Sequence, residues 1–482
     1  EAQASSKGPK IPLFCCLYSI IKVHLTHFKK CDHFIAKLSA KGPRYPFLLT
    51  GVFVQQQTNH TGSYYAATAN DTQDRPALTG DIEADVCIVG GGFTGVVTGL
   101  TLAELGYDVV ILEGAKIGWG ASGRNGGQII NGFSREIEYI EKTVGPEGAT
   151  ALASLALEGG NVIRELVSRY GIQCDLKYGS VLAACTNKQL RGMSDVKDMW
   201  AGRGRNGIEI LNSHAIRDHV GTDKYVGGWI DHKGGHIHPL NLVQGEARAA
   251  ESLGARIFEQ TRVTEVDHQA ETPVVHTEGG SVKSRYVVLA GNAYLGKTVK
   301  QLYPKILPAS TQIIVTEPLS DKMANDILPT DMCVEDANYV LDYFRLTADK
   351  RLLFGGGTVY GGEDVADVEN ALRPNMERLF PATKDLKVEF GWQGNIALTW
   401  SRLPHVGRLG AGTYFAHGYS GHGVTSSHMM GRLVAHALHG DATAFDVFES
   451  MPARSFPGGQ LLSVPLSTLG CWWYSMRDKL GI

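Results

Sequence analysis

The chain has 482 residues, with 46 Lys and Arg against 49 Asp and Glu, which gives a net charge of −3. At roughly 100 to 200 residues per domain, this length supports two or three domains with a large core. The charge balance provides no basic field for a polyanion, which argues against nucleic acid as the main partner. Glycine contributes 58 residues without a collagen-like period, and this excess indicates tight turns and close backbone approach to a ligand.

The cysteine pattern and the hydropathy give an expectation for the compartment. The 8 cysteines lack the dense, regular spacing of a secreted disulfide framework. No apolar run reaches the roughly 18 residues that span a bilayer; the longest candidate, 11–21, is broken by Pro12 and Ser19. We therefore expect a soluble, cytoplasmic protein without a membrane span.

The N-terminal extension, residues 1–62, has no predicted role. Lys7 and Lys10 precede an apolar segment as in a signal peptide, but no small-residue cleavage site follows, so an appended extension is favoured. Cysteines and histidines gather here without a CxxC or HxxxH pair, and we therefore expect no metal site. These residues are Cys15, Cys16, His24, His27, Cys31 and His33.

A βαβ unit begins near Asp81. The nearly all-apolar run 84–89 is typical of a strand buried on both faces, and it leads directly into Gly90-Gly91-Gly92. Apolar positions from Val96 to Leu105 predict a helix, and Gly106 stands where a left-handed C-terminal cap belongs. A second buried strand, 107–112, then ends in Glu113.

The first turn of this unit predicts a dinucleotide site. Gly90, Gly92 and Gly95 have GxGxxG spacing between strand and helix. Glycine lets backbone N–H groups approach a pyrophosphate at the helix N-terminus, and a carboxylate such as Glu113 accepts hydrogen bonds from the ribose. The GxGxxG spacing alone is weak evidence for a dinucleotide site, but here the strand, the helix, the second strand and the acidic residue follow in the order that such a site requires.

Two further glycine-rich segments favour FAD over NAD. Segment 118–128 follows Glu113 almost at once, and Arg124 with Asn125 suits a second contact along an extended ligand that contains pyrophosphate. Segment 418–425 opens the last predicted helix with free N–H donors. Ser420 is not a nucleophile elbow, because His422 stands where GxSxG requires glycine.

These motifs carry a family resemblance. Residues 87–95 read CIVGGGFTG, 120–128 GASGRNGGQ, 334–348 VEDANYVLDYFRLTA and 418–425 GYSGHGVT. From about Ser63 to the end, the chain resembles the D-amino-acid-oxidase-type FAD oxidoreductases, within the amine-oxidising branch that acts on gamma-glutamylputrescine. The resemblance implies an α/β fold, with a Rossmann-like FAD-binding domain interleaved with an α+β substrate domain built on a mainly antiparallel sheet.

The resemblance also implies the cofactor contacts. FAD is expected to be noncovalent, because no counterpart of a flavin attachment motif is present. The expected cofactor-binding residues are Gly90, Gly91, Gly92, Phe93, Thr94, Gly95, Glu113, Gly120, Ala121, Ser122, Arg124, Asn125, Gly126, Gly127, Gln128, Val263, Gly291, Gly421, His422, Gly423, Val424 and Thr425.

The chain is expected to visit the two domains in turn. Strands and polar helices over 171–230, and strand formers over about 307–357, indicate one domain that the chain enters twice. The expected FAD-binding segments are 81–170, 231–300 and 396–445, the substrate-domain segments are 171–230 and 301–395, and 446–482 forms a C-terminal tail.

Candidate reactive residues have competing interpretations. The sequence favours neither of two roles for His422, that of a catalytic group and that of a packing or capping residue. Alternation along a strand places Tyr343 and Arg345 on one face, where Arg345 could clamp a substrate carboxylate or make an ordinary surface pair. His236 and His238 are interpreted as domain-junction residues rather than metal ligands.

The expected function is amine oxidation. The resemblance implies that the terminal primary amine of a gamma-glutamylated diamine becomes an aldehyde, with release of ammonia and hydrogen peroxide, in putrescine catabolism. Molecular oxygen is the expected electron acceptor. The alternatives are another amino-acid or sarcosine-type flavin oxidase or dehydrogenase, and a flavoprotein subunit in which FAD is structural.

Overall fold

A computed structural model describes residues 58–480, except 136 and 458. Residues 57–482 form one compact unit, which is described by itself. Most of the N-terminal extension, with its cysteines and histidines, lies outside the described residues. In the described part, no helix is both long and apolar enough to cross a membrane.

The first sheet, sheet A, is mainly parallel. Its strands in spatial order are β16 (His405–Arg408), β17 (Thr413–His417), β10 (Ser281–Leu289), β1 (Ile82–Val89), β2 (Val109–Leu112) and β7 (Arg256–Phe258). Only β16 runs antiparallel to its neighbour on this path, and the hairpin of β8 (Val263–Asp267) and β9 (Val274–Thr277) continues from β10. Every residue of β2 is buried, as a strand covered on both faces requires.

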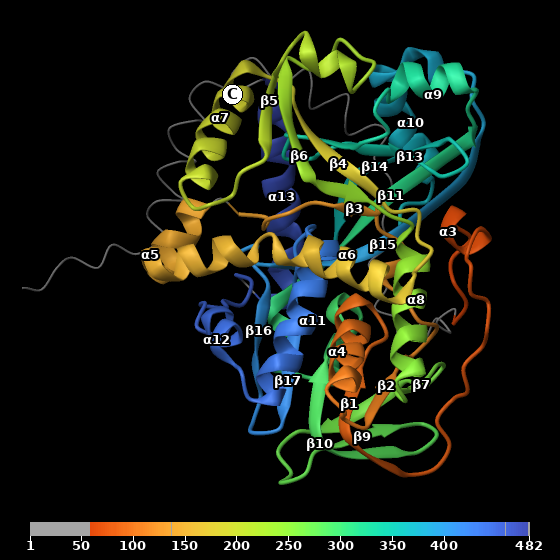
Figure 1. Cartoon of the computed structure of the whole chain (residues 1–482), viewed down its shortest axis with the longest axis vertical. Coiled ribbons are helices and arrows are strands. Elements are labelled where there is room, and N and C mark those ends of the chain that lie inside the picture. Colours follow the sequence, from red (N-terminus) through yellow and green to blue (C-terminus); the bar gives the residue numbers. More distant parts are fainter. Residues whose placement is uncertain (1–57, 136, 458, 481–482) are drawn as a thin grey trace, which may run out of the picture. The chain divides into compact units, whose positions relative to one another are not determined.

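Helices pack against sheet A and against one another. They are α4 (Phe93–Glu104), α5 (Ile137–Leu155), α6 (Glu158–Tyr170), α8 (Pro239–Ser252), α11 (Gly423–His439) and α12 (Thr443–Glu449). In Figure 1 the labelled strands of sheet A lie in the lower half of the unit, beside α4 and α11. A Cβ atom on Gly431 of α11 would lie 2.9 Å from the Thr94 carbonyl oxygen, so glycine allows α11 and α4 to pack closely.

The second sheet, sheet B, is mainly antiparallel. Its strands in spatial order are β15 (Val388–Thr399), β11 (Ile306–Pro318), β14 (Arg351–Tyr360), β13 (Tyr343–Leu346), β12 (Cys333–Asp336), β4 (Lys177–Ala184), β6 (Gly227–His236) and β3 (Gln128–Ile129), with β5 (Ile208–Asn212) paired to β6. The pair β12 and β4 is parallel. Figure 1 places the strands of this sheet in the upper half of the unit, which confirms the expected two-part α/β fold.

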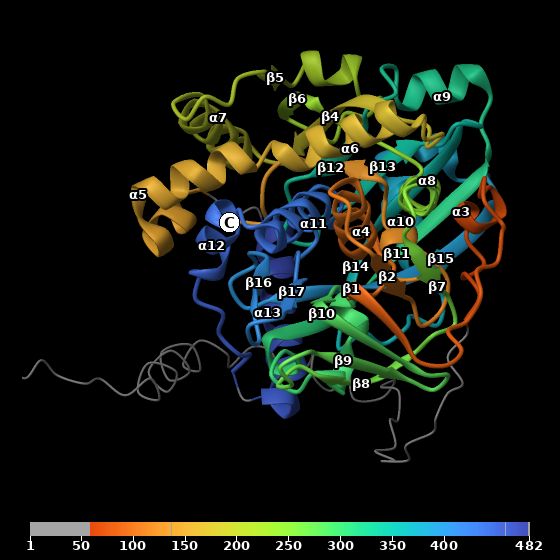
Figure 2. The same cartoon turned by 60° about the horizontal axis from the view of Figure 1, so that its bottom comes forward.

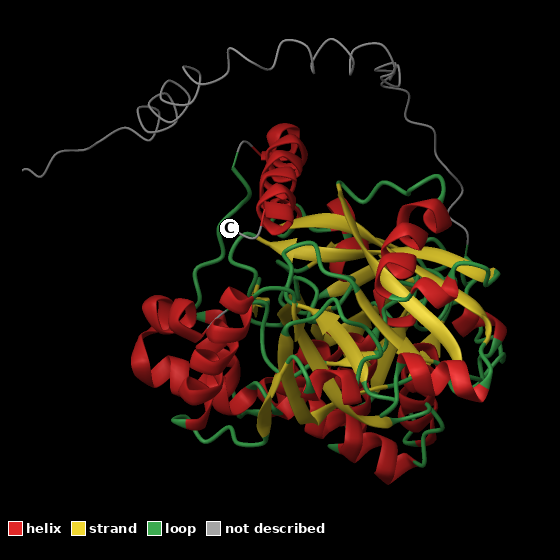
Figure 3. Ribbon diagram, turned by 90° about the horizontal axis from the view of Figure 1, so that it is seen from above, coloured by secondary structure: helices red, strands yellow, loops and turns green. Residues whose placement is uncertain are grey.

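The two faces of sheet B bury different cores. Phe344 and Phe354 pack in a cluster on the outer face, together with α9 (Asp321–Ile327) and α10 (Val368–Leu379). Ile313 and Trp392 belong instead to the core shared with sheet A and its helices. The inner face of sheet B therefore packs toward sheet A and its helices, and Figure 3 shows helices along the outside of the strand layers.

The remaining elements complete the described chain. They are α3 (Tyr64–Ala67), α7 (Asn187–Ala201), α13 (Gly459–Leu480), and the short 3-10 turns η2 (Ala121–Gly123), η3 (Ala215–Asp218), η4 (Asn292–Tyr294), η5 (Gly296–Thr298), η6 (Tyr303–Lys305) and η7 (Pro381–Thr383). Figure 2 shows α5 and α6 following one another, and α5 bends at Gly145, directly before Pro146.

The division into domain segments stays a prediction, but sheet membership can be compared with it. Strand β6 continues to His236, past the expected boundary at 230/231, and β15 crosses the boundary at 395/396. Strand β3 leaves the first FAD-binding segment to join sheet B. Helix α12 crosses the expected boundary at 445/446, and the C-terminal tail contains α13; the sequence analysis predicted neither helix.

Candidate cofactor and active site

The turn from β1 into α4 is shaped by glycines. Gly90 has φ +111°, a region that favours glycine, and a Cβ on it would lie 2.9 Å from the Ala290 carbonyl. A Cβ on Gly95 would lie 1.9 Å from the Gly90 oxygen. The N-cap of α4 is Gly92, which has no side chain to accept from the first N–H groups, and no acidic residue occupies the first turn of the helix. The helix therefore presents free N–H groups to an anion.

Glu113 faces this turn from the end of β2. Its Oε2 accepts a hydrogen bond from the Gly91 N–H at 2.7 Å, and its Oε1 accepts one from the Ala115 N–H at 2.9 Å. Burial raises the pKa of Glu113. Each carboxylate oxygen can accept a further hydrogen bond, as binding of a ribose hydroxyl requires. The structure thus places the expected acidic residue beside the expected glycines.

The second glycine-rich segment, residues 118–128, is a self-supporting loop, named the flavin loop below. The Asn125 side chain donates to the carbonyls of Ala121 and Ser122 and accepts from the Gly127 N–H. Ser122 Oγ accepts a hydrogen bond from the Phe93 N–H at 2.9 Å, which ties the loop to the start of α4. The first and second segments therefore meet.

Arg124 is the cation of the flavin loop. Its guanidinium lies 4.3 Å from the centre of the Trp119 ring, and its Nε donates to the Trp119 carbonyl at 2.7 Å. No ion pair joins Arg124 to a carboxylate among the described residues, and burial lowers its pKa. A partly buried guanidinium without a counter-anion suits a negatively charged ligand.

Tyr343 and Arg345 lie behind the flavin loop, on the inner face of sheet B. A Cβ on Gly126 would lie 2.6 Å from Cε2 of Tyr343. Arg345 is buried, and it donates to the Gly126 carbonyl at 2.7 Å, to the Leu346 carbonyl at 3.0 Å and to the Tyr65 hydroxyl at 3.0 Å. Three of its five N–H groups therefore have protein acceptors. The carboxylate clamp expected of Arg345 stays a prediction.

The third segment brings His422 to the N-terminus of α11. Ser134 Oγ donates to the Ser420 carbonyl at 2.7 Å and lies 2.8 Å from His422 Nδ1. Because that hydroxyl proton is already engaged, Nδ1 must carry the imidazole proton and Nε2 is left with a lone pair. Burial lowers the pKa of His422 to about 4, so the ring is neutral at pH 7.

The other expected contacts lie around these segments. The backbone of Gly291 is 3.0 Å from the Cβ position of Gly90, and Oδ1 of its neighbour Asn292 accepts from the Gly418 N–H. The Thr261 N–H donates to the Glu113 carbonyl, which brings the start of β8, where Val263 stands, near Glu113. In the third segment, Thr425 Oγ1 donates to the Ile130 carbonyl. Gln128 Nε2 donates to the Val334 carbonyl of strand β12 in sheet B.

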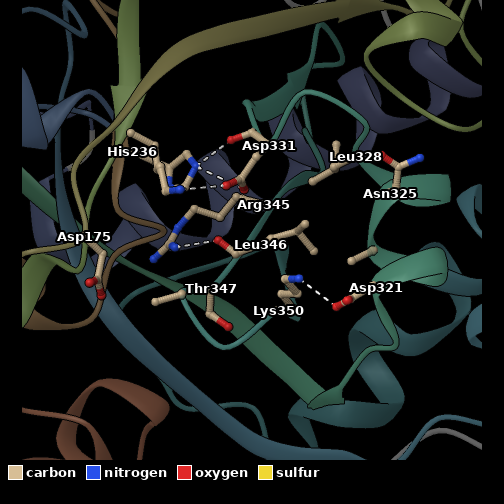
Figure 4. Close-up of a pocket in the computed structure, with 13 residues that line it drawn as sticks. Asp175, His236, Asp321, Asn325, Leu328, Asp331, Arg345, Leu346, Thr347 and Lys350 are labelled. Carbon is tan, nitrogen blue, oxygen red and sulfur yellow. Dashed lines mark hydrogen bonds and ion pairs between the residues drawn. The ribbon is translucent and has the colours of Figure 1, made fainter.

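A cavity of about 300 Å³ is lined by Arg345 and opens between α9 and the turn that joins β13 to β14 (Figure 4). Lys177, Lys350, Asp321 and Asp331 lie on its wall. His236 Nε2 donates to the Asp331 carbonyl at 2.9 Å, and burial together with the charge of Arg345 lowers the pKa of His236 to about 3. The cavity wall is therefore mixed in charge.

His238 has a structural role at the junction. It is the N-cap of α8, its Nδ1 accepts from the Asn241 N–H at 3.1 Å, and its ring packs edge-on against Tyr65. Burial lowers its pKa to about 3. Within the described ranges, no three His, Cys, Asp or Glu side chains gather as metal ligands.

This set of residues fits a flavin dinucleotide. The close-packed glycines leave no space for a side chain. The start of α4, whose N-cap is Gly92, and Arg124, which has no carboxylate partner among the described residues, lie on connected segments and offer donors to a pyrophosphate. A family model described as FAD dependent oxidoreductase, the DAO family, matches residues 85–437. The chain belongs to the DAO family. It is an FAD-dependent oxidoreductase, as the motifs indicated.

Individual DAO relatives match nearly the whole described chain. Gamma-glutamylputrescine oxidoreductase of Escherichia coli (strain K12) is 49% identical over 426 residues, which cover 88% of this chain and 100% of that protein. The probable oxidoreductase OrdL of Haemophilus influenzae (strain Rd) is 39% identical over 425 residues, 87% of this chain and 98% of that protein. The expected family resemblance is thereby confirmed.

A solved structure shares the fold. The crystal structure of glycine oxidase from Geobacillus kaustophilus matches with a TM-score of 0.65 at 23% identity, covering 77% of this chain and 99% of that chain. At this level of identity the match supports the DAO fold and leaves the substrate open.

Several residues at the site were not singled out from the sequence. Tyr65 and Ser134 precede or follow the glycine motifs, and nothing in their sequence context predicts their contacts with Arg345 and His422. Glu335 is different, because it stands in the segment 334–348 and strand alternation could have placed it on the same face as Cys333.

Proposed function

We propose that this protein is an oxidase of the terminal primary amine of gamma-glutamylputrescine. The products are an aldehyde, ammonia and hydrogen peroxide, with molecular oxygen as the electron acceptor. The observation that carries the proposal is the similarity to the Escherichia coli oxidoreductase over that protein's whole length, which includes both sheets. A cytoplasmic location remains part of the prediction.

The chain's own residues would hold the cofactor and prepare the amine. The α4 N-terminus and Arg124 would bind the pyrophosphate, Glu113 would bind the ribose, and the flavin loop would contact the flavin ring. Bound noncovalently, FAD would supply the acceptor for two electrons. An alkylammonium has no nitrogen lone pair to assist hydride departure, so a basic group of the protein or water must first remove a proton.

Anaerobic titration with single amines tests the proposal. Gamma-glutamylputrescine should bleach the flavin absorbance, and readmitted oxygen should restore it with one hydrogen peroxide per amine, counted in a peroxidase-coupled assay. Preferential bleaching by glycine or sarcosine would instead support an amino-acid oxidase, a possibility raised by the 26% identity to a glycine oxidase over 75% of the chain. Failure of every amine to bleach the flavin would favour a structural role for FAD.

A further inference from the structure

Glu335 lies on the inner face of sheet B, in one row with Tyr343. In the strand registers, Glu335 pairs with Tyr343 of β13 on one side and with Leu182 of β4 on the other. Directly paired residues of neighbouring strands point to the same face. The row continues through Gly355 and Ile313 to Trp392, whose ring lies in the core shared with the FAD-binding half.

This row contacts the flavin loop at several points. Trp392 Nε1 donates to the Arg124 carbonyl at 2.9 Å, and the ring of Tyr343 packs against Gly126. Gln128 Nε2 donates to the carbonyl of Val334, the residue before Glu335, at 2.9 Å. Glu335 therefore stands among residues that hold the loop predicted to bind the flavin.

The Glu335 carboxyl lacks a partner within the described part of the chain. No hydrogen bond or ion pair engages it, whereas the neighbouring Asp336 accepts from the backbone and side-chain amides of Asn338. Desolvation is the cause that raises the pKa of Glu335 to about 7. Its side chain nevertheless remains partly exposed, so a ligand can reach it. Burial of a carboxylate without a partner costs free energy unless a cation or a hydrogen-bond donor binds to it.

The nearby cation is Arg345, two residues from Tyr343 on the same face, but its guanidinium donates to Gly126, Leu346 and Tyr65 and makes no ion pair with Glu335 within the described part of the chain. Tyr343 faces Glu335 from β13 and Cys333 lies on the same face of its own strand, and burial raises the pKa of each, so both are neutral at pH 7. Strand β4 contributes the apolar Leu182, and the flavin loop approaches through the neutral Gln128. A cationic ligand would therefore find one uncompensated negative charge.

We propose that Glu335 binds the terminal ammonium of the substrate and accepts its proton. One N–H bond of the ammonium breaks and one O–H bond forms on the Glu335 carboxyl, while the bonding pair stays on nitrogen as the lone pair of a neutral amine. This inference rests on the proposed amine oxidation and identifies the base that it needs.

The comparison with His422 favours Glu335 as that base. The pKa of His422 is lowered to about 4 and that of Glu335 is raised to about 7. Burial thus makes the Glu335 carboxylate the stronger proton acceptor of the two. Its negative charge also attracts the ammonium, which a neutral imidazole does not.

The first test measures binding without turnover. Holoenzyme and the E335Q variant are titrated with tert-butylammonium, which cannot be oxidised because its nitrogen-bearing carbon has no hydrogen, and with neutral tert-butanol. Calorimetry should give an affinity for the ammonium about 10- to 150-fold weaker in E335Q, the range of a charge-assisted pair, with no change for tert-butanol. Unchanged ammonium affinity in E335Q would overturn the proposal.

The second test uses the pH profile of kcat/KM with gamma-glutamylputrescine. The wild-type kcat/KM should rise as pH increases through about 7, and this rise, the acidic limb of the profile, should be absent in E335Q. D336N is the matched control, because Asp336 is the adjacent residue, its pKa is also raised to about 7, and strand alternation turns it to the outer face. D336N should keep the limb; its loss in D336N and retention in E335Q would refute the assignment.

The two tests separate this inference from the proposed function. If no amine bleaches the wild-type flavin, amine oxidation is wrong, while the tert-butylammonium titration still decides whether Glu335 binds a cation. If E335Q does not fold, E335L supplies an uncharged, apolar side chain of similar size for both measurements, and an unaltered ammonium affinity in E335L would likewise refute the role of Glu335.

Discussion

Replacing Arg345 with Met should weaken the flavin loop rather than abolish recognition of one substrate. The guanidinium donates to the Gly126 carbonyl and to the Tyr65 hydroxyl, and Met cannot donate to either. Hydrogen bonds to charged groups contribute roughly 1.5 to 3 kcal/mol each, and removal of a buried cation without a carboxylate partner offsets part of that loss. We expect a net destabilisation of about 3 kcal/mol.

The assay compares two amines and one control variant. R345M should lower the melting temperature of the FAD-saturated enzyme and reduce kcat/KM by similar factors for gamma-glutamylputrescine and for putrescine, which lacks the alpha-carboxylate. K350M is the matched control, since Lys350 lies on the same cavity wall but makes only an exposed pair with Asp321. A loss confined to gamma-glutamylputrescine, with unchanged melting, would refute this reasoning and establish the carboxylate clamp.

Three further outcomes are expected. G126A should reduce FAD affinity at least about tenfold, measured by flavin release, because the added methyl would lie 2.6 Å from the Tyr343 ring. G192A is the control and should leave FAD affinity unchanged, because a methyl at Gly192 would lie in open space. S134A should lower kcat about 5- to 30-fold if the His422 tautomer matters, the range of one lost hydrogen bond of about 1 to 2 kcal/mol, and an unchanged kcat would argue for a packing role. The pKa of Glu335 rises from 4.5 to about 7 on folding, so between these pH values the folded state binds more protons than the unfolded state. The stability of the wild-type protein should therefore fall as pH rises from 4.5 to 7, by up to about 3 kcal/mol at 1.36 kcal/mol per pKa unit. Thermal melts at pH 5 and pH 8 should show this loss of stability in the wild type and not in E335L, and parallel pH dependences in the two proteins would contradict the prediction.

The βαβ unit could be predicted because its signals are local. A continuous apolar run predicts β1, glycines mark the turn, and Gly106, with φ +86°, ends the helix region as expected. The three glycine-rich segments were also recognised separately. Their meeting, through the bond of Phe93 to Ser122 and that between the hydroxyls of Thr94 and Tyr419, depends on pairings between residues far apart in sequence.

The chemistry of sheet B could not be read in the same way. Placing Glu335 beside Tyr343 requires the register between β12 and β13, which packing of both faces decides. The hydrogen bonds of Arg345 depend on Tyr65, a distant residue without a motif. Helix α13 was missed because Pro465 and Gly470 interrupt its sequence pattern, although the structure carries the helix through both.

The order of strands in sheet A has a consequence for synthesis on the ribosome. Strand β1 pairs with β10, about 200 residues later, and β10 pairs with β17, which ends at His417. The nascent chain must therefore carry an apolar, unpaired strand edge until most of the protein has emerged. We expect recovery of active enzyme to be sensitive to chaperone supply and growth temperature, and early truncated products to aggregate rather than retain FAD.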